Sequence, residues 1–265
     1  ALNTFTLTQS QIDLLHSRQL YVNIHTTVYP AGEIRGQLLP MADDYFSTNM
    51  FGSNQVPAVF SNSSGALALE LHGDTLVVTG AFDNLDGKFN PNIAGGAHLH
   101  NGLAGQTGGI SIELNTTVDS DVYGGFFAAA DNSFVLTADQ IAALQSHQLY
   151  ANIHTAVHNG GELRGQVVGA ADAVFRAHLS GANEYPFVSS LAEGQVIAEL
   201  RGNNLLVSGA FNGLESNATN AHIHIGRAGQ SGGVIFSLTY ELETDQRSGV
   251  FRAAANTFTL TDDQM

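Results

Sequence analysis

The stretch LYVNIHTTVYPAGEIRGQL, Leu20 to Leu38, returns 129 residues later as LYANIHTAVHNGGELRGQV, Leu149 to Val167. In both copies, residues typical of strands stand on either side of a turn rich in Gly with Pro or Asn. This is the pattern of two antiparallel strands joined by a short loop. A strand pair that recurs along a chain predicts an array of similar β-domains.

Two further blocks repeat and give the order of the unit. GAFDNL from Gly80 returns as GAFNGL from Gly209, and AHLHNGLAGQTGG from Ala97 returns as AHIHIGRAGQSGG from Ala221. The order within a unit is GAF, AHxH, a helix signal, NIHT and GExRG. Residues 46–168 therefore make a complete unit. Residues 1–40 correspond to the C-terminal part of a unit, and residues 175–265 to the N-terminal part.

Two interpretations of the incomplete units stay open. The chain is a window of a longer tandem array, or the tail of one chain and the head of the next build one domain together. In both cases neither fragment can bury its apolar face alone, so we expect each to be completed by a neighbouring chain or repeat. A head-to-tail contact does not close on itself and generates a filament.

Most of each unit alternates apolar and polar residues with a period of two, as in Ala66–Phe82. One short helix per unit is predicted by T-x-x-Q capping boxes. These boxes are Thr8/Gln11, Thr137/Gln140 and Thr261/Gln264. The fold class expected is all-β, with tandem Greek-key antiparallel β-sandwiches that each carry one short helix.

Composition excludes several classes of protein. The 265 residues contain no Cys, and 9 basic against 24 acidic side chains give a net charge of −15. Disulfide scaffolds and Cys-ligated metals are therefore excluded, and so few cations argue against nucleic-acid binding. No apolar run is long enough for a membrane span, so no membrane insertion is expected. Low lysine, high acid and no thiol suit an extracellular location. Without an initiator Met or a signal peptide at Ala1, we expect a processed product or part of a longer protein.

Histidines recur at matching places. His98 and His100 lie two apart on a predicted strand, so both imidazoles point to one face, and His154 lies in the NIHT strand of the same unit. Three imidazoles suit copper or zinc. The alternative is that these side chains only hydrogen-bond loop carbonyls.

The same spacing appears in the incomplete units. His222 and His224 repeat the pair, and His25 is the equivalent of His154, so these three are the metal ligands expected in a completed second unit. Tyr29 replaces His158, which therefore cannot be an essential fourth ligand in both units. The histidines without a His partner in the other copies are expected at the surface, namely His16, His72, His147 and His178.

Glu and Arg also recur two residues apart in the GExRG strand. We expect each pair to be a partly buried structural ion pair without a catalytic role. The pairs are Glu33 with Arg35 and Glu162 with Arg164. Three N-x-S/T sequons, at Asn62, Asn115 and Asn217, allow glycosylation without predicting it.

These motifs, with FRAHLSGANEYP from Phe175, resemble the CHRD domain, the module named after chordin. The resemblance covers essentially the whole chain. It implies an extracellular β-sandwich module, often in tandem, that in animals belongs to an antagonist of bone morphogenetic proteins. FSTNMFGSNQVP from Phe46 departs from the usual opening of the family. The H-x-H strand beside a Gly-rich loop also looks like the copper ligands of Cu,Zn superoxide dismutase, which favours copper over zinc.

Three functions follow as hypotheses. The first is a non-enzymatic extracellular structural and binding protein that assembles with itself head to tail, each sandwich holding one metal, with copper favoured. The second is a copper-dependent redox enzyme, which needs an open coordination position. The third is a protein-binding module without metal.

Overall fold

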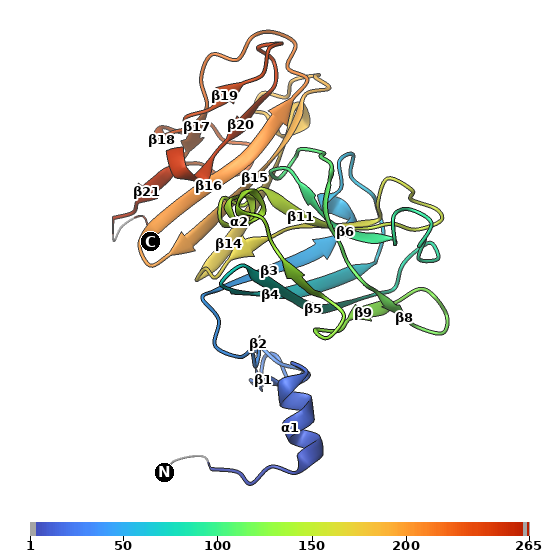
Figure 1. Cartoon of the computed structure of the whole chain (residues 1–265). Helices are drawn as coiled ribbons and strands as arrows, with labels where there is room; N and C mark the ends of the chain where they lie inside the picture. The colour runs from blue at the N-terminus through green and yellow to red at the C-terminus, as the bar shows by residue number, and fades with distance from the viewer. Residues whose placement is uncertain (1–3, 262–263, 265) are drawn as a thin grey trace.

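The structure, a computed structural model, describes residues 4–261 and 264. Figure 1 shows a small N-terminal segment (residues 4–40), a large central unit (44–169) and a C-terminal unit (172–261) that follow one another in space. The segment and the C-terminal unit lie on opposite sides of the central unit. Strands dominate, so the all-β prediction is confirmed.

The central unit is built on one sheet with the strand order β7-β6-β11-β12-β3-β4-β5-β9-β8. β12 and β3 share one residue pair, Arg164 with Phe51, and the sheet folds over at this junction into two layers. β10 pairs with β5, and β13 pairs with β3. The elements are β3 (Asp44–Phe51), β4 (Ser64–His72), β5 (Thr75–Asp83), β6 (Ala97–Asn101), β7 (Ile110–Glu113), β8 (Thr117–Val118), β9 (Gly125–Phe127), β10 (Ser133–Val135), α2 (Ala138–Gln145), β11 (Leu149–Ile153), β12 (Leu163–Gln166) and β13 (Val168–Gly169), with a 3-10 turn at Gly52–Asn54.

One core lies between these layers, and it follows from the alternation in the sequence. Leu67, Leu69 and Leu71 are buried at every second position of β4. The opposite layer contributes Leu99 of β6 and Ile153 of β11. Because side chains on a strand alternate between its faces, the residues between these apolar positions face away from the core.

The N-terminal segment repeats the end of the central unit without its core. It consists of α1 (Gln9–His16), β1 (Tyr21–Ile24) and β2 (Ile34–Gln37). Tyr21 pairs with Gln37 in β1–β2, just as Tyr150 pairs with Gln166 in β11–β12. The same local sequence therefore gives the same hairpin, with or without a sandwich to cover it.

The C-terminal unit has the sheet order β14-β15-β16-β20-β19, with β21 on β16 and a separate β17–β18 pair. A cavity of about 840 Å³ opens between these sheets. Its apolar lining includes Leu179, Val196, Val207, Phe211 and Phe251, and we call it the groove. The elements are β14 (Ala173–Ser180), β15 (Glu193–Arg201), β16 (Asn204–Asn212), β17 (His222–His224), β18 (Val234–Ser237), β19 (Glu241–Leu242), β20 (Gly249–Phe251) and β21 (Thr257–Thr259), with 3-10 turns at Gly181–Asn183 and Ala253–Ala255.

The capping boxes at Thr8 and Thr137 are confirmed, because each caps a helix of eight residues through its hydroxyl and the Gln three positions on. At the third box, Thr261 N donates to Gln264 Oε1 at 2.9 Å. The helix predicted there falls largely on residues 262, 263 and 265, which lie outside the described part. Within the described residues, none of the helices has the length and hydrophobicity needed to span a membrane.

One surface prediction was wrong. His147 is buried, because it lies in the contact between the central and C-terminal units. A histidine whose environment comes from a neighbouring domain cannot be placed from the periodicity of its own strand.

Candidate metal centre

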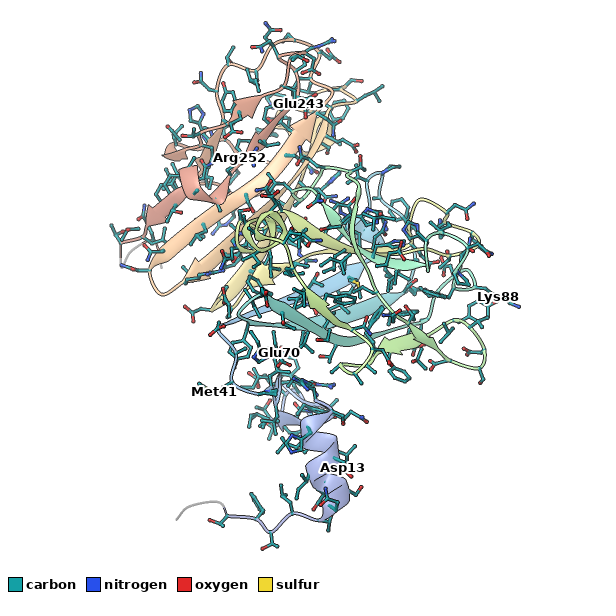
Figure 2. The ribbon with its side chains drawn as sticks, in the orientation of Figure 1. Asp13, Met41, Glu70, Lys88, Glu243 and Arg252 are labelled. Carbon is teal, nitrogen blue, oxygen red and sulfur yellow. The ribbon has the colours of Figure 1, made fainter. Side chains whose placement is uncertain are left out.

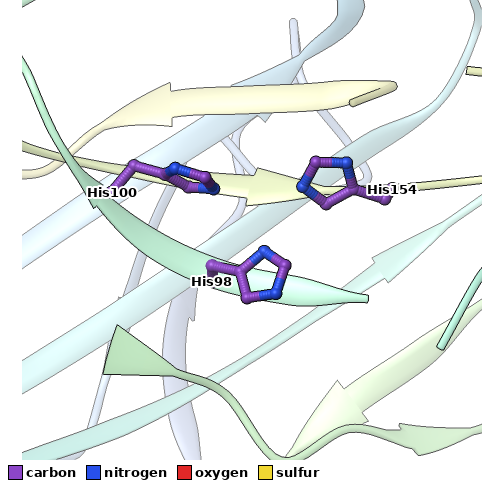
Figure 3. A group of neighbouring side chains, drawn as sticks. All are labelled: His98, His100 and His154. Carbon is purple, nitrogen blue, oxygen red and sulfur yellow. The ribbon is translucent and has the colours of Figure 1, made fainter. Parts of the chain in front are cut away.

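Three histidines of the central unit meet on the face of the sheet that points away from the core. His98 and His100 flank the core residue Leu99 on β6, and His154 directly follows the neighbouring β11 (Figure 3). Their ring centroids lie 5.3 Å (98–100), 5.1 Å (98–154) and 6.1 Å (100–154) apart. One nitrogen from each ring lies within 4.8 Å of the others, so the structure brings this predicted triad together.

The second nitrogen of each ring contacts a backbone carbonyl. His98 Nε2 lies 2.5 Å from the oxygen of Ala94, and His100 Nδ1 lies 2.9 Å from that of Gly108. His154 Nδ1 lies 2.9 Å from the oxygen of Asn159. Because a carbonyl only accepts, these nitrogens carry the protons, which fixes the tautomer of each ring.

The remaining nitrogens are buried and have no partner. They are Nδ1 of His98 and Nε2 of His100 and His154. Burial lowers the pKa of His100 to about 4, and it also lowers the pKa of His154. Both rings are therefore neutral near pH 7, and each presents a lone pair. A group of buried imidazole nitrogens without hydrogen-bond partners, on oriented rings, fits a copper or zinc ion. His158 is not part of this group.

Glu162 fixes the corner that carries His154. Its carboxylate accepts hydrogen bonds from the Thr155 hydroxyl at 2.8 Å and from the backbone nitrogens of Asp86 and Gly87 at 2.7 and 3.2 Å. The Ser63 hydroxyl is a fourth donor. Burial raises the pKa of Glu162, but these hydrogen bonds outweigh burial and lower it overall. The carboxylate is thus ionised and connects the three loops that carry Ser63, Asp86 and Thr155.

The predicted ion pair of Glu162 with Arg164 was wrong. The Arg164 guanidinium stacks 3.5 Å above the Tyr150 ring and donates to the carbonyls of Leu103 and Gln106 at 3.2 and 2.6 Å. Glu162 precedes β12 and turns toward the loops instead. Glu162 and Arg164 recur together because each of them holds loops through its own hydrogen bonds. The spacing of the two residues alone could not distinguish this arrangement from an ion pair.

Tyr150 links this anchor to the triad. Its ring stacks on His100 with centroids 5.0 Å apart and planes 8° from parallel. Its hydroxyl accepts from Gly108 N at 3.1 Å, in the loop whose carbonyl holds His100. Arg164, Tyr150 and the Gly-rich loop therefore support one face of the triad. The aromatic residue between the Arg and the His was not identified from the sequence, although Tyr recurs at Tyr21 beside Arg35.

Comparison with known families accounts for this repeated architecture. The sequence model of the CHRD domain matches residues 1–38, 46–167 and 175–265. The chain belongs to the CHRD family. This confirms the resemblance seen in the repeated motifs. A comparison with curated proteins gave no match.

The matches over residues 1–38 and 175–265 contain the three histidines predicted for a second triad. His222 and His224 have centroids 5.6 Å apart, and His224 Nδ1 lies 3.0 Å from the carbonyl oxygen of Gly232. His25 Nδ1 lies 3.0 Å from that of Pro30. These arrangements match those of the complete CHRD unit, but all three rings are exposed. Within one chain His25 is not brought together with His222 and His224.

The second predicted ion pair was also wrong. Arg35 stacks 3.5 Å above the Tyr21 ring, as Arg164 does on Tyr150. Glu33 is exposed, and its side chain makes no ion pair among the described residues. The segment thus keeps the conformation of the complete unit while lacking the loops that Glu162 and Arg164 hold there.

Proposed function

We propose that this CHRD protein is an extracellular structural and binding protein that assembles head to tail, the groove of one chain receiving the N-terminal segment of the next. The observation that carries the proposal is the complementarity between the groove and that segment. CHRD domains are typically extracellular modules, which agrees with the acidic, Cys-free composition.

The groove lies where the complete unit has its second layer. In the central unit, β11 and β12 cover this place with Ala151, Ile153 and Leu163, all buried in the core. The C-terminal unit has the opposing strands β14–β16 but no counterpart of β11 and β12. An apolar cavity open to water at this place is costly, and filling it is favourable.

The N-terminal segment supplies the missing side chains. Val22, Ile24 and Ile34 stand at the positions of Ala151, Ile153 and Leu163. Ile24 is 50 % exposed and Ile34 is 64 % exposed. Burying each side chain of this size contributes about 1.5–3 kcal/mol.

Polar groups match as well. Glu33 stands where Glu162 accepts from the nitrogens of Asp86 and Gly87, and the equivalent nitrogens of Glu215 and Ser216 lie at the lining of the groove. A seated segment therefore supplies an acceptor for these donors, as buried polar groups require.

The partner must be another copy or another repeat. The segment cannot reach the groove of its own chain, because the central unit lies between them (Figure 1). A following repeat of a longer polypeptide would present the same chemistry. The proposal therefore commits to a second copy of the chain, and its test uses residues 1–265 alone.

The decisive experiment compares two variants of that chain. Ile24→Asp places a charge where the groove is apolar and should abolish assembly. Val28→Asp is the matched control, because its counterpart Val157 is still 66 % exposed in the complete unit. We expect filaments by electron microscopy for the wild type and Val28→Asp, and dispersed monomers for Ile24→Asp. A monomeric wild type, or Ile24→Asp filaments, would overturn the proposal.

We further propose that each completed unit holds one metal ion, with copper favoured over zinc. His98, His100 and His154 would hold it in the central unit, and His222, His224 with His25 of the next chain would hold it at the junction. The preset ring tautomers support this assignment, because oriented imidazoles bind copper strongly. An ion at the junction would also stabilise assembly by mass action.

The burial of the central triad favours a structural role for this ion. A redox enzyme needs a coordination position that its substrate can reach, whereas His98, His100 and His154 are all buried. The copper-dependent redox enzyme and the metal-free binding module stay as alternative hypotheses. A redox assay on copper-loaded protein and elemental analysis of native protein separate them.

A further inference from the structure

A buried carboxylate lies at the contact between the N-terminal segment and the central unit. Glu70 of β4 is 1 % exposed, and its two oxygens lie 2.9 and 3.2 Å from Arg18 Nε and Nη2. His72 Nε2 lies 3.1 Å from the same carboxylate. Arg18 belongs to the turn between α1 and β1 of the segment, so Glu70 receives a cation from the preceding unit.

The contact between the central and C-terminal units contains an equivalent carboxylate. Glu199 of β15 is 1 % exposed, and its Oε1 lies 3.0 Å from His147 Nδ1. Arg201 Nη2 lies 2.9 Å from Oε2. His147, Glu199 and Arg201 follow Arg18, Glu70 and His72 by 129 residues, which is the repeat offset. Arg and His exchange places around the same carboxylate.

The backbone that presents Arg18 and His147 to these carboxylates is the same in both places. Arg18 and His147 both adopt a φ of 59°, an uncommon left-handed conformation for such residues. Gln37 Nε2 donates to the Arg18 carbonyl at 2.6 Å, and Gln166 Nε2 donates to the His147 carbonyl at 2.7 Å. A strained turn that the same hydrogen bond holds in both units belongs to the fold of the repeat, because such strain persists only where the surrounding structure maintains it.

The linkers that lead into β3 and β14 are held by equivalent hydrogen bonds. Gly73 N donates to an Asp43 carboxylate oxygen at 2.6 Å, and Gly202 N donates to that of Asp172 at 2.6 Å. Asp43 N and Asp172 N donate to the carbonyls of Leu71 and Leu200 at 2.8 and 2.7 Å. Both linkers therefore enter their units along the same path.

We propose that Glu70 and Glu199 mark one docking surface, repeated in each CHRD unit, whose partner is the α1–β1 or α2–β11 turn of the preceding unit. The surface accepts Arg or His from that turn. Each CHRD unit is thereby set in the same orientation relative to its predecessor. This inference concerns contacts within one chain and does not depend on head-to-tail assembly.

The two copies of this surface differ in how much of the preceding unit covers them. On the C-terminal unit, Leu103 of the central Gly-rich loop packs against Ala210 and Val250. The equivalent residues of the central unit are Ala81 and Phe126, which pair with each other as Ala210 and Val250 do, and both are exposed. The N-terminal segment has no Gly-rich loop, so a complete preceding unit would cover this patch. The partner that fits the surface is thus a CHRD unit.

Spin labels can test the orientation, since the chain has no native Cys. The pair Asp13→Cys with Lys88→Cys spans the first contact, between the N-terminal segment and the central unit. The pair Lys88→Cys with Glu243→Cys spans the second contact, between the central and C-terminal units. All three sites are exposed (Figure 2). Ile24→Asp is present throughout to keep the chain monomeric. We expect narrow distance distributions for both pairs in electron–electron double resonance.

Each carboxylate should affect its own contact. Glu199→Gln should broaden the Lys88/Glu243 distribution about twofold and leave Asp13/Lys88 unchanged, because the carboxylate that lies against both His147 and Arg201 is lost. Glu70→Gln should do the reverse. The double variant His147→Arg with Arg201→His copies the first contact and should keep a narrow distribution. Glu184→Gln, at an exposed carboxylate, is the control.

Broad distributions in the parent chain would overturn the inference, as would narrow ones in Glu199→Gln and Glu70→Gln. A broad distribution in the variant His147→Arg with Arg201→His would show that Arg and His are not interchangeable. It would overturn the claim that the surface accepts either residue. A label pair within the central unit, Lys88→Cys with Asp131→Cys, reports folding in every variant. These distance measurements use a monomeric chain, so they test the inference even if the protein does not form filaments.

Discussion

At the scale of single residues, the carbonyl partners of the three central histidines determine what the rings can do. A ring whose proton points to Ala94, Gly108 or Asn159 presents its other nitrogen to the shared space. Orientation of this kind raises metal affinity, since the ion does not have to order the ligands itself.

Removal of one ring should therefore empty the central site. His100→Ala should lower metal affinity by about 100-fold or more, given that loss of an outer partner alone costs about 10–100-fold. His178→Ala, at an exposed ring, is the control. Elemental analysis after dialysis against a chelator gives the stoichiometry. Equal metal content in both variants would contradict the assignment.

His147 should make the second contact sensitive to acid. Burial lowers the pKa of His147 and is the largest effect. Glu199 and Asp44 raise this pKa and Arg201 lowers it, and the net result is a pKa below the usual value. The folded pKa lies below that of a free imidazole, so the unfolded state takes up the proton first as pH falls. Stability from this residue is complete above about pH 6.5 and declines below it, by at most about 1.4 kcal/mol per pH unit.

The first contact carries Arg18 at the equivalent position and should not share this loss. Hydrogen exchange of β15 and β4 between pH 7 and 5 compares the two contacts in one sample. His147→Gln should remove the difference between them. Equal acid sensitivity of both contacts in the wild type would contradict this account.

At the scale of elements, the hairpins are formed by local sequence, and one glycine in each has a necessary backbone conformation. Gly161 has a φ of 118°, and a Cβ there would collide with the side chains of Asn152 and Gln55. Gly32 has a φ of 124° and faces Asn23 in the same way. Only glycine adopts this conformation at little cost.

Gly161→Ala should destabilise the central unit by about 1–3 kcal/mol, because strain of this kind has that cost. Gly160→Ala is the matched control, since a Cβ at Gly160 meets nothing within 4 Å. Urea unfolding of both variants gives the difference. A Gly160→Ala variant as unstable as Gly161→Ala would contradict the conformational explanation.

The elements show which features the sequence could predict. Capping boxes and hairpin turns are local, so α1, α2 and the β11–β12 hairpin could be predicted from short stretches. The triad could be predicted because a strand places His98 and His100 on one face. The partners of Glu162 and His147 come from loops and a neighbouring unit. Residues far apart in the sequence, such as Ser63 and Glu162 at 99 positions, meet only in the folded chain.

At the scale of the whole molecule, the central unit separates two complementary surfaces. A chain shortened to residues 41–265 keeps the groove and loses the segment. It should therefore bind the free segment of a growing assembly and offer none of its own. Equimolar shortened chain added to residues 1–265 should shorten the filaments, as measured by electron microscopy.

Residues 41–170 serve as the control, because this fragment contains the central unit without the groove. It should leave filament length unchanged. Filaments of equal length in the presence of either fragment would show that the groove is not where chains join.

The placement of the segment and the groove on opposite sides of the central unit gives any polymer of this protein a direction. One tip of the polymer carries a free N-terminal segment and the other carries a free groove. Each added subunit fills one of these and presents a new one of the same kind, so growth has no intrinsic last step and never produces two identical tips. A reagent that recognises only the vacant groove would mark a single extremity, and a surface that displays such a site would set which way all its fibres point.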